Sequence, residues 1–143
     1  MPLQQALSSS PMVVKPNRTE LAETVEMAID SDSSLREAIR KLIAQGPRWV
    51  IVTHGAKETI ASDGESFWRV NSPKIKSVNP IGSGDSFAAG LTAGIAQGQT
   101  VPEACKLAVA CGAANAMTDQ PGQVRMSDIN ALLEKIEITN GEL

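Results

Sequence analysis

The chain has few aromatic residues, no tyrosine, two cysteines and one histidine among its 143 residues. With two Phe and two Trp, its core must consist of aliphatic and small side chains. Its formal net charge is −3, which gives no basic field for nucleic acid, so we expect no nucleic-acid partner. Because no apolar run reaches transmembrane length and no targeting pattern opens the sequence, we expect no membrane association and a cytoplasmic location.

The two cysteines, Cys105 and Cys111, fall in one expected helix. Six residues of helix rise is about 9 Å, which exceeds the Cα separation that a disulfide accepts. The same spacing puts the two thiols on different helix faces, which argues against a shared metal ion. We expect both to be small buried apolar residues in a reducing compartment.

The order of the expected elements indicates an α/β fold in a single domain, residues 1–143. The helical period appears in residues 19–29 and 35–46. A short strand in residues 12–17 ends at Pro16, and the apolar run 49–55 is typical of a parallel strand that is covered on both faces. The pair Asp63-Gly64 predicts a tight hairpin turn.

Three helices are expected in the rest of the chain, over residues 85–97, over residues 103–117 and after a cap at Ser127, followed by a polar tail. Strand, helices, hairpin and further helices together predict a partly parallel sheet. The first expected strand follows almost directly on the start of the sequence, so the chain reads like the second half of a larger α/β fold.

Small residues recur at every fourth position on two of these helices: Gly90, Gly94 and Gly98 on one, and Ala104, Ala108, Gly112 and Ala116 on the next. Residues four apart share a helix face. We therefore expect the two helices to approach each other closely. The alternative, a membrane dimer motif, fits poorly because the helices are short and carry polar residues.

The sequence Gly82-Ser83-Gly84-Asp85 opens one of the expected helices. A helix N-terminus carries unpaired N–H groups and a partial positive charge, so a glycine turn leading into it can bind an anion. Asp85 could then accept a proton from a hydroxyl that attacks a bound phosphate. The alternative is an ordinary helix start in which Asp85 is the cap or a first-turn charge.

The stretch NPIGSGDSFAAG, residues 79–90, resembles the C-terminal signature of the PfkB (ribokinase-like) carbohydrate kinases, in particular the tagatose-6-phosphate kinase and fructose-1-phosphate kinase branch. The resemblance implies an anion hole at Gly82, Ser83 and Gly84, with Asp85 as the catalytic base. It also implies a set of nucleotide-binding residues: Thr53, Gly55, Asn79 and Asn115. For Asn115, an ordinary polar residue near a helix end is an equally good interpretation.

The stretch VVKPNRTELAE, residues 13–23, resembles the P-N-x-x-E element of the same family. There the Asn and Glu organise magnesium around the ATP phosphates, and the resemblance implies the same role, acting through water, for Asn17 and Glu20. The same spacing is also a helix capping box, and both interpretations can hold together.

The resemblance implies the C-terminal part of a ribokinase-like three-layer α/β/α fold, with a mostly parallel sheet and a β-hairpin. The implied reaction transfers the γ-phosphoryl group of ATP, with Mg²⁺, to a hydroxymethyl group of a ketohexose phosphate of the tagatose-6-phosphate or fructose-1-phosphate type. The family's N-terminal sugar-binding and lid portion has no counterpart in the sequence. We therefore expect a homodimer or association with that missing half. The alternative is a catalytically silent nucleotide-binding or oligomerisation module left by truncation.

Overall fold

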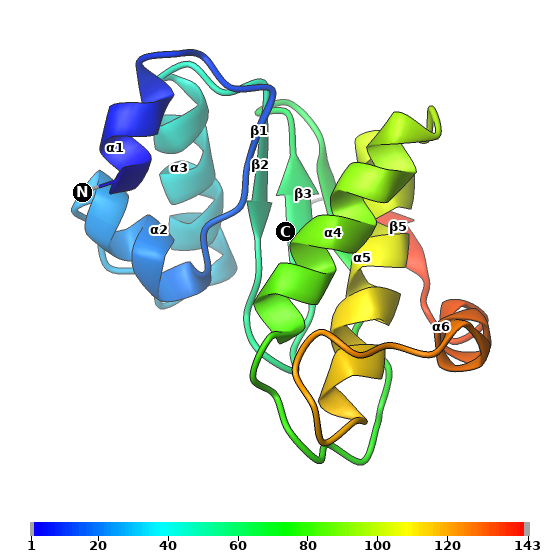
Figure 1. Cartoon of the computed structure of the whole chain (residues 1–143). Helices are drawn as coiled ribbons and strands as arrows, with labels where there is room; N and C mark the ends of the chain where they lie inside the picture. The colour runs from blue at the N-terminus through cyan, green and yellow to red at the C-terminus, as the bar shows by residue number, and fades with distance from the viewer. Residues whose placement is uncertain (1, 142–143) are drawn as a thin grey trace. The chain divides into compact units, whose positions relative to one another are not determined.

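Residues 2–141 are described by a computed structural model, in which the helices and strands divide between two units (Figure 1). The first unit is Met1–Arg69 with Asn140–Leu143, and the second is Val70–Thr139. The first contains the helices α1 (Pro2–Leu7), α2 (Arg18–Val25) and α3 (Asp32–Ile43). The second contains the helices α4 (Ser83–Ala96), α5 (Val101–Ala116) and α6 (Met126–Leu133).

The strands form one mixed sheet in the order β1-β2-β3-β4-β5. They are β1 (Val13–Val14), β2 (Trp49–Val52), β3 (Thr59–Ser62), β4 (Phe67–Val70) and β5 (Ile138–Asn140). β1 and β2 pair in parallel, whereas β2 and β3 pair antiparallel. The expected hairpin thus adds antiparallel strands beside the parallel pair, and the α/β class is confirmed.

The core of the first unit is aliphatic, as the scarcity of aromatic residues predicts. Val50, Ile51 and Val52 of β2 are 0–2% exposed, which confirms that this strand is covered on both faces. The main cluster joins α1, α2 and α3 to the sheet and consists of Leu7, Val14, Leu21, Leu35, Ala38, Ile39, Leu42, Val50, Val52, Ile60 and Phe67.

The hairpin between β3 and β4 is confirmed, but its turn is longer than the sequence predicts. β3 ends at Ser62 and β4 begins at Phe67, so four residues connect them. The Asp63 carboxylate accepts hydrogen bonds from the backbone N–H groups of Glu65 and Ser66, at 3.1 and 2.9 Å. This side-chain bonding closes a wider loop where a two-residue turn was expected.

The expected close approach of two helices is confirmed in the second unit, where α4 and α5 lie side by side (Figure 1). A Cβ atom added at Gly90 would lie 2.8 Å from Cys111 Sγ and 3.0 Å from Ala108 Cα. One added at Gly94 would lie 2.8 Å from Ala104 Cβ. Glycine is therefore required at both positions by contact between the helices.

Gly98 does not belong to this interface. A Cβ atom there would meet nothing within 4 Å, and its φ of +83° lies in the left-handed region. It follows Gln97, the C-cap of α4, and ends that helix in the way that C-terminal glycines commonly do.

The helix boundaries differ from the sequence prediction where caps were misassigned. α5 begins at Val101, ahead of Pro102, because Thr100 and Glu103 form a capping box. Hydrogen bonds from the Thr100 hydroxyl and backbone N–H lower the pKa of Glu103. Ser127 was expected to cap α6 but lies inside it, so that prediction is wrong: Arg125 holds the N-cap position without a side-chain bond.

Both ends of the chain hold elements that the sequence did not predict. Residues 2–7 form α1, whose Leu7 enters the core. The expected polar tail contributes β5 at Ile138–Asn140, and Gly141 N donates to Phe67 O at 3.1 Å. The last two residues of that tail lie outside the described residues.

The two cysteines are free thiols in different surroundings. Cys105 is buried, as expected, and burial raises its pKa to about 12. Cys111 is only half-buried, contrary to expectation, although its side chain lies beside Gly90 of α4. Burial also raises the pKa of Cys111.

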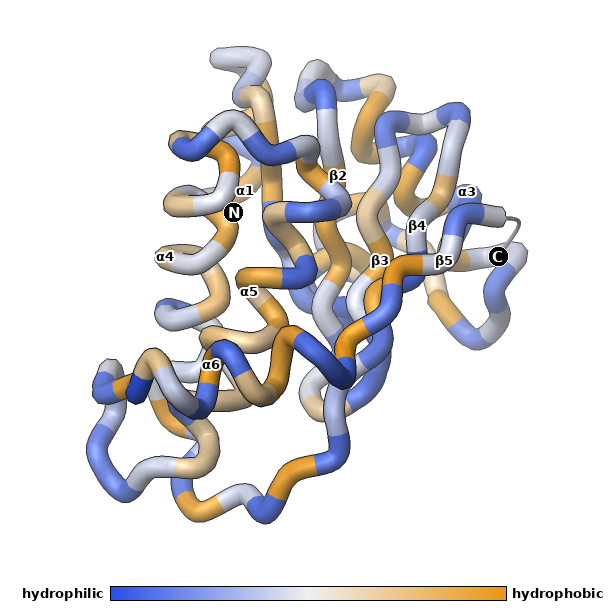
Figure 2. Tube along the Cα trace, turned by 90° about the vertical axis from the view of Figure 1, so that its right-hand side faces the viewer, coloured by the Kyte–Doolittle hydropathy of each residue, from blue (hydrophilic) through white to orange (hydrophobic). Residues whose placement is uncertain are grey.

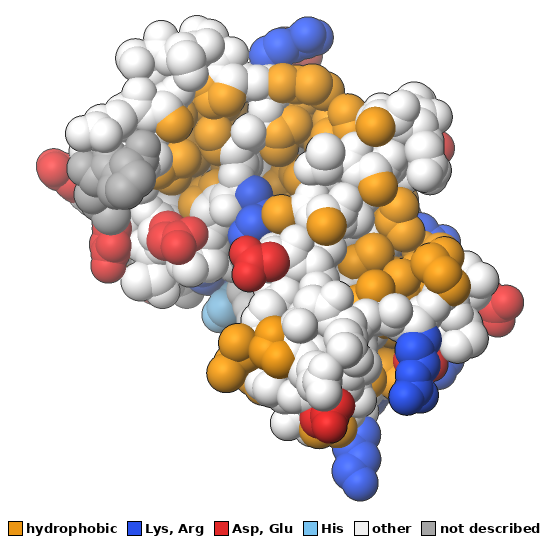
Figure 3. Space-filling model, in the orientation of Figure 1, with side chains coloured by type: hydrophobic (Ala, Val, Ile, Leu, Met, Phe, Trp, Pro, Cys, Tyr) orange, Lys and Arg blue, Asp and Glu red, His pale blue; other side chains and the backbone are white. Residues whose placement is uncertain are grey.

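In Figure 2 hydrophobic and hydrophilic residues alternate along α6, whose Ile129 and Leu132 are buried. In Figure 3 hydrophobic side chains show over much of the visible face, with isolated basic and acidic side chains among them. Within the described part of the chain, no helix has both the length and the apolar character that crossing a bilayer requires.

Candidate active site

The glycine turn forms the N-terminus of α4, which begins at Ser83, two residues earlier than predicted. Gly82 is the N-cap, and its carbonyl accepts the first helical bond from Ser86 N at 2.9 Å. Ser83 N already donates to Pro80 O at 3.1 Å. The backbone N–H groups of Gly84 and Asp85 precede the first helical bond, so they have no carbonyl within the helix to bond.

The two glycines of the turn serve different purposes. Gly82 has a φ of +82°, and an added Cβ would lie 3.1 Å from Pro121 Cβ. Gly84 lies within the helix, and an added Cβ would meet nothing within 4 Å. Gly82 therefore shapes the turn, whereas Gly84 keeps open the space in front of the free N–H groups.

Asp85 is the acidic residue of the first turn of α4, and its side chain is exposed. Among the described residues, no hydrogen bond or ion pair to its carboxylate is recorded. Of the ordinary helix-start alternative, the cap is wrong because Gly82 occupies that position, whereas the first-turn charge is confirmed for Asp85. The carboxylate is therefore available to a ligand bound at the helix N-terminus.

Asn79 fixes the approach to the turn. Its Oδ1 accepts a hydrogen bond from Ile81 N at 3.0 Å, and its Nδ2 donates to Asp119 O at 3.1 Å. Its own backbone N–H donates to Ala116 O at 3.1 Å. The side chain thus ties the turn to the segment after α5.

Asn115 lies beneath the same turn and is 0% exposed. Its Nδ2 donates to Ile81 O at 2.8 Å and to Ser83 Oγ at 3.1 Å. Its Oδ1 accepts from Gly122 N at 2.6 Å. Because Asn115 is buried and bonded in this way, it contacts the turn and the following loop from inside the protein.

The first unit holds the other expected site residues. Asn17 and Glu20 form the predicted capping box, with Glu20 N donating to Asn17 Oδ1 and Asn17 N donating to Glu20 Oε2, each at 2.8 Å. Asn17 also forms a parallel bridge with Thr53, flanked by Arg18 N donating to Thr53 O at 3.0 Å. The structure thus brings Asn17, Glu20 and Thr53 together.

His54, in the loop after Thr53, lies near the cations Lys57 and Arg18 and also near the anion Glu58. The pKa of His54 is lowered by partial burial and by the nearby charges of Lys57 and Arg18. Gly55 is exposed, with a φ of +55° and no atom within 4 Å of an added Cβ. This surface favours neutral histidine and is compatible with a nearby anion.

The described residues contain no group of three or more His, Cys, Asp or Glu side chains placed to hold a metal ion. Magnesium needs few protein ligands because it keeps several waters and binds phosphate oxygens. In Glu20, Oε2 accepts the capping bond, and no partner is recorded for Oε1. The Glu20 carboxylate thus fits the expected role of contacting magnesium through a water molecule.

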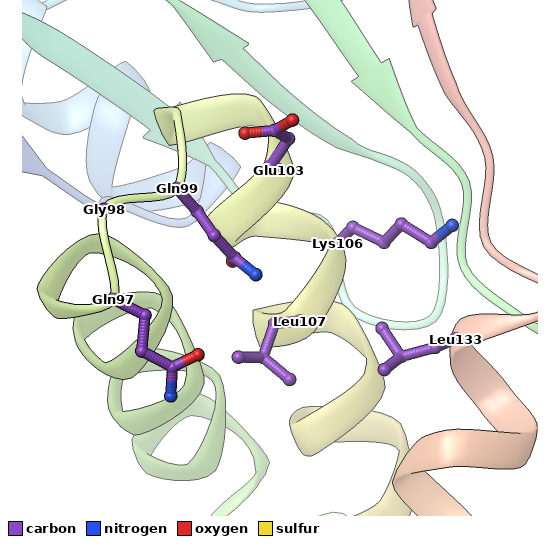
Figure 4. Close-up of a pocket in the computed structure, with 7 residues that line it drawn as sticks. All are labelled: Gln97, Gly98, Gln99, Glu103, Lys106, Leu107 and Leu133. Atoms are coloured by element: carbon purple, nitrogen blue, oxygen red, sulfur yellow. The ribbon is translucent and has the colours of Figure 1, made fainter.

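Two pockets open at opposite ends of α4. One of about 420 Å³ lies at its C-terminal end, between Gln97 and Gln99, Leu107 of α5 and Leu133 of α6 (Figure 4). The other, of about 620 Å³, adjoins the glycine turn and is lined by Val78, Met117, Thr118, Asp119, Gly122, Gln123, Val124, Arg125 and Asp128. The larger pocket is linked to the turn through Gly122, which packs on Gly82, and none of its lining residues belongs to the Gly82–Asp85 segment.

The loop of residues 117–123 is a part of the site region that sequence reasoning missed. Its composition, with Pro121 and Gly122, indicated a loop but not its contacts. In the structure Thr118 Oγ1 bonds to carbonyl groups on both sides of it, including Asn115 O at 2.9 Å. The signal that could have found it is the polar Asn115 in an otherwise small and apolar helix.

Alanine at the two glycines of the turn is expected to have opposite effects. Gly82→Ala is expected to lower the free energy of unfolding by about 2 kcal/mol, through left-handed backbone strain and the Pro121 contact. Gly84→Ala is expected to leave stability unchanged or raise it by up to about 1 kcal/mol, because alanine favours helix. Gly84→Ala should still weaken anion binding, and urea unfolding with calorimetric titration of Mg-ATP separates the two results. Normal nucleotide binding in the Gly84→Ala protein would contradict the assignment of an open anion site.

Comparison with known proteins gives consistent matches. The model of the pfkB family carbohydrate kinases matches residues 1–124. A tagatose-6-phosphate kinase from Staphylococcus epidermidis is 36% identical over 139 residues, which cover 95% of this chain and 45% of that protein. The chain thus spans about half the length of the curated relatives it matches.

Solved structures show the same partial coverage. A provisionally assigned phosphofructokinase from Staphylococcus aureus superposes with a TM-score of 0.88 at 32% identity, over 97% of this chain and 45% of that one. Phosphofructokinase-2 from Escherichia coli, in complex with substrates and products, gives a TM-score of 0.85 at 25% identity, over 93% and 44%.

Proposed function

Because the chain belongs to the pfkB family of carbohydrate kinases, we propose that it supplies the ATP-binding side of a kinase for a ketohexose phosphate. The proposed acceptor is a hydroxymethyl group of a sugar phosphate of the tagatose-6-phosphate or fructose-1-phosphate type. The tagatose-6-phosphate kinase match supports this class of acceptor. The observation that carries the proposal is the open N-terminus of α4, with free N–H groups beside an exposed carboxylate.

The proposed reaction is an in-line phosphoryl transfer. The acceptor hydroxyl oxygen bonds to the γ-phosphorus of ATP, the bond from that phosphorus to the bridging oxygen breaks, and ADP leaves. Asp85 takes the hydroxyl proton. The N–H groups of Gly84 and Asp85, with the dipole of α4, stabilise the charge that develops on the transferred oxygens.

Magnesium supplies charge neutralisation and phosphate orientation when it is bound with the nucleotide. Asn17 and Glu20 are proposed to hold its coordinated waters, with the capping box fixing both side chains. Thr53 and Gly55 follow β2 in the same unit and are proposed to contact the nucleotide, as is Asn79 beside the turn.

Glu20→Gln separates the capping role from the metal role. Glutamine can keep the capping bond to Asn17 N, so the free energy of unfolding should change by less than about 0.5 kcal/mol. Loss of the charge should raise the magnesium concentration needed for half-maximal ATP binding by about tenfold. Titration of ATP at several magnesium concentrations measures this. The exposed Glu23→Gln, one turn along α2, is the matched control and should change neither quantity.

The kinase proposal is tested by two measurements on the chain. Calorimetry follows Mg-ATP binding, and coupled assays follow transfer to tagatose-6-phosphate and fructose-1-phosphate. Each assay is run with the chain alone and with the N-terminal half of the S. epidermidis relative added. Nucleotide binding with transfer supports the proposal, and binding without transfer in either mixture supports a silent nucleotide-binding module. If the chain binds no nucleotide, the ATP-site proposal is wrong.

The proposed partners are the small-molecule substrates, together with a second copy of the chain or an N-terminal half. Sedimentation analysis of the chain, alone and mixed with that half, distinguishes a homodimer from a complementing complex.

A further inference from the structure

Asn115 is the only asparagine among the buried polar side chains of the described residues. It lies in α5 among small apolar neighbours, and Ala114 and Ala116 are also buried. Burying a primary amide is costly unless each of its donors and acceptors is paired. A buried asparagine in an apolar part of a helix is therefore expected to have a specific structural role.

The amide is fully paired. Its two N–H donors go to Ile81 O at 2.8 Å and Ser83 Oγ at 3.1 Å, both on the turn. Its Oδ1 accepts from Gly122 N at 2.6 Å and from Ser86 Oγ at 3.3 Å. An asparagine amide has two donors and two acceptor lone pairs, so nothing is left over for a ligand.

These bonds join Asn115 to two segments that are separate in the sequence, residues 81–86 and the loop of residues 117–123. The two donors reach Ile81 and Ser83, where α4 begins, and the acceptor reaches Ser86 in the first turn of α4 and Gly122 in the loop. That loop in turn packs on the turn, since Gly122 N would lie 3.3 Å from a Cβ atom at Gly82. Asn115 is thus the common partner of the turn and the loop that lines the adjacent pocket.

We infer that Asn115 is a positioning residue, which holds the Gly82–Gly84 turn and the loop of residues 117–123 in the arrangement that exposes the N–H groups of Gly84 and Asp85. This inference rests on the proposed function for its catalytic consequence. In this role Asn115 affects nucleotide binding by holding the turn and does not contact the nucleotide itself. The Asn115 side chain fixes the orientation of the anion-binding N–H groups without contacting the anion.

Two variants at this position test the inference. Asn115→Ala removes all four bonds, whereas Asn115→Asp keeps both acceptors and loses both donors to the turn. We expect each to raise the Kd for Mg-ATP at least about tenfold. Hydrogen exchange of the Gly122 amide should accelerate at least about tenfold in Asn115→Ala but change little in Asn115→Asp, because only the former loses the acceptor.

Val109→Ala is the matched control for a general loss of stability in α5. Val109 is buried but makes no contact recorded with the turn, so its Kd for Mg-ATP should stay within about twofold of the unmodified chain. If Asn115→Ala does not fold, Ser83→Ala removes a single partner of the amide and should raise the Kd by about threefold. A folded Asn115→Ala protein with unchanged Gly122 exchange and unchanged Kd overturns the inference.

Failure of the inference is distinguishable from failure of the proposed function. If the unmodified chain binds no Mg-ATP, the proposed function fails, and amide chemical shifts decide the role of Asn115. Shifts confined to residues 81–86 and 117–123 in Asn115→Ala then support the positioning role. Unchanged shifts in both segments overturn it.

Discussion

Asp85→Asn is expected to lower kcat for phosphoryl transfer by about 10²- to 10⁴-fold, the range for loss of a general base. The affinity for Mg-ATP should change by less than about twofold, because asparagine is isosteric and the free N–H groups of the α4 N-terminus remain. The assay uses the chain fused to the N-terminal half of the S. epidermidis relative, which supplies the segment that the match does not cover.

The control for Asp85→Asn is Glu134→Gln, which removes one negative charge from an exposed position of the same unit. It should leave both kcat and the Kd for ATP unchanged. A fused enzyme that keeps more than about half of its kcat with Asp85→Asn would show that Asp85 is not the base. Loss of ATP affinity instead of kcat would indicate that its carboxylate acts in binding.

Gly90→Val is expected to destabilise the second unit by about 3 kcal/mol or more. The first added carbon already meets Cys111 Sγ at 2.8 Å and Ala108 Cα at 3.0 Å, and overpacking of this kind forces backbones apart. Chemical denaturation monitored by circular dichroism measures the loss.

Ala89→Val provides the reference for Gly90→Val, since it places the same side chain on the exposed side of α4. It should cost about 0.5 kcal/mol, the intrinsic helix penalty of valine. Adding Cys111→Ala to Gly90→Val should recover part of the loss because it removes the nearer obstacle. Equal costs for Gly90→Val and Ala89→Val would contradict the close packing of α4 and α5.

Local sequence signals predicted those parts of the structure that depend on neighbouring residues. Residues close together in the sequence determine three such features. They are the apolar run of β2, the capping box of Asn17 and Glu20, and the small-residue spacing on α4 and α5. The turn at Gly82 was predictable in the same way, because a glycine before a helix indicates a left-handed backbone followed by free N–H groups.

Long-range contacts were not predictable in this way. Strand β5 depends on the pairing of Gly141 with Phe67, far away in the sequence, and its residues look like a polar tail when read alone. The burial of Asn115 was not predictable for a related reason. A polar residue near a helix end gives no sign of burial until the turn and the loop that satisfy its amide are brought to it.

The glycines at the α4–α5 contact have a consequence for how the sequence can change over time. The room that Gly90 and Gly94 leave is taken by Ala104, Ala108 and Cys111, so the volumes on the two helices are complementary. A larger side chain on one helix is tolerated only with a smaller one opposite. Substitutions at these positions should therefore appear in related sequences as compensating pairs. Covariation of position 90 with positions 108 and 111 would reflect the short distance between α4 and α5.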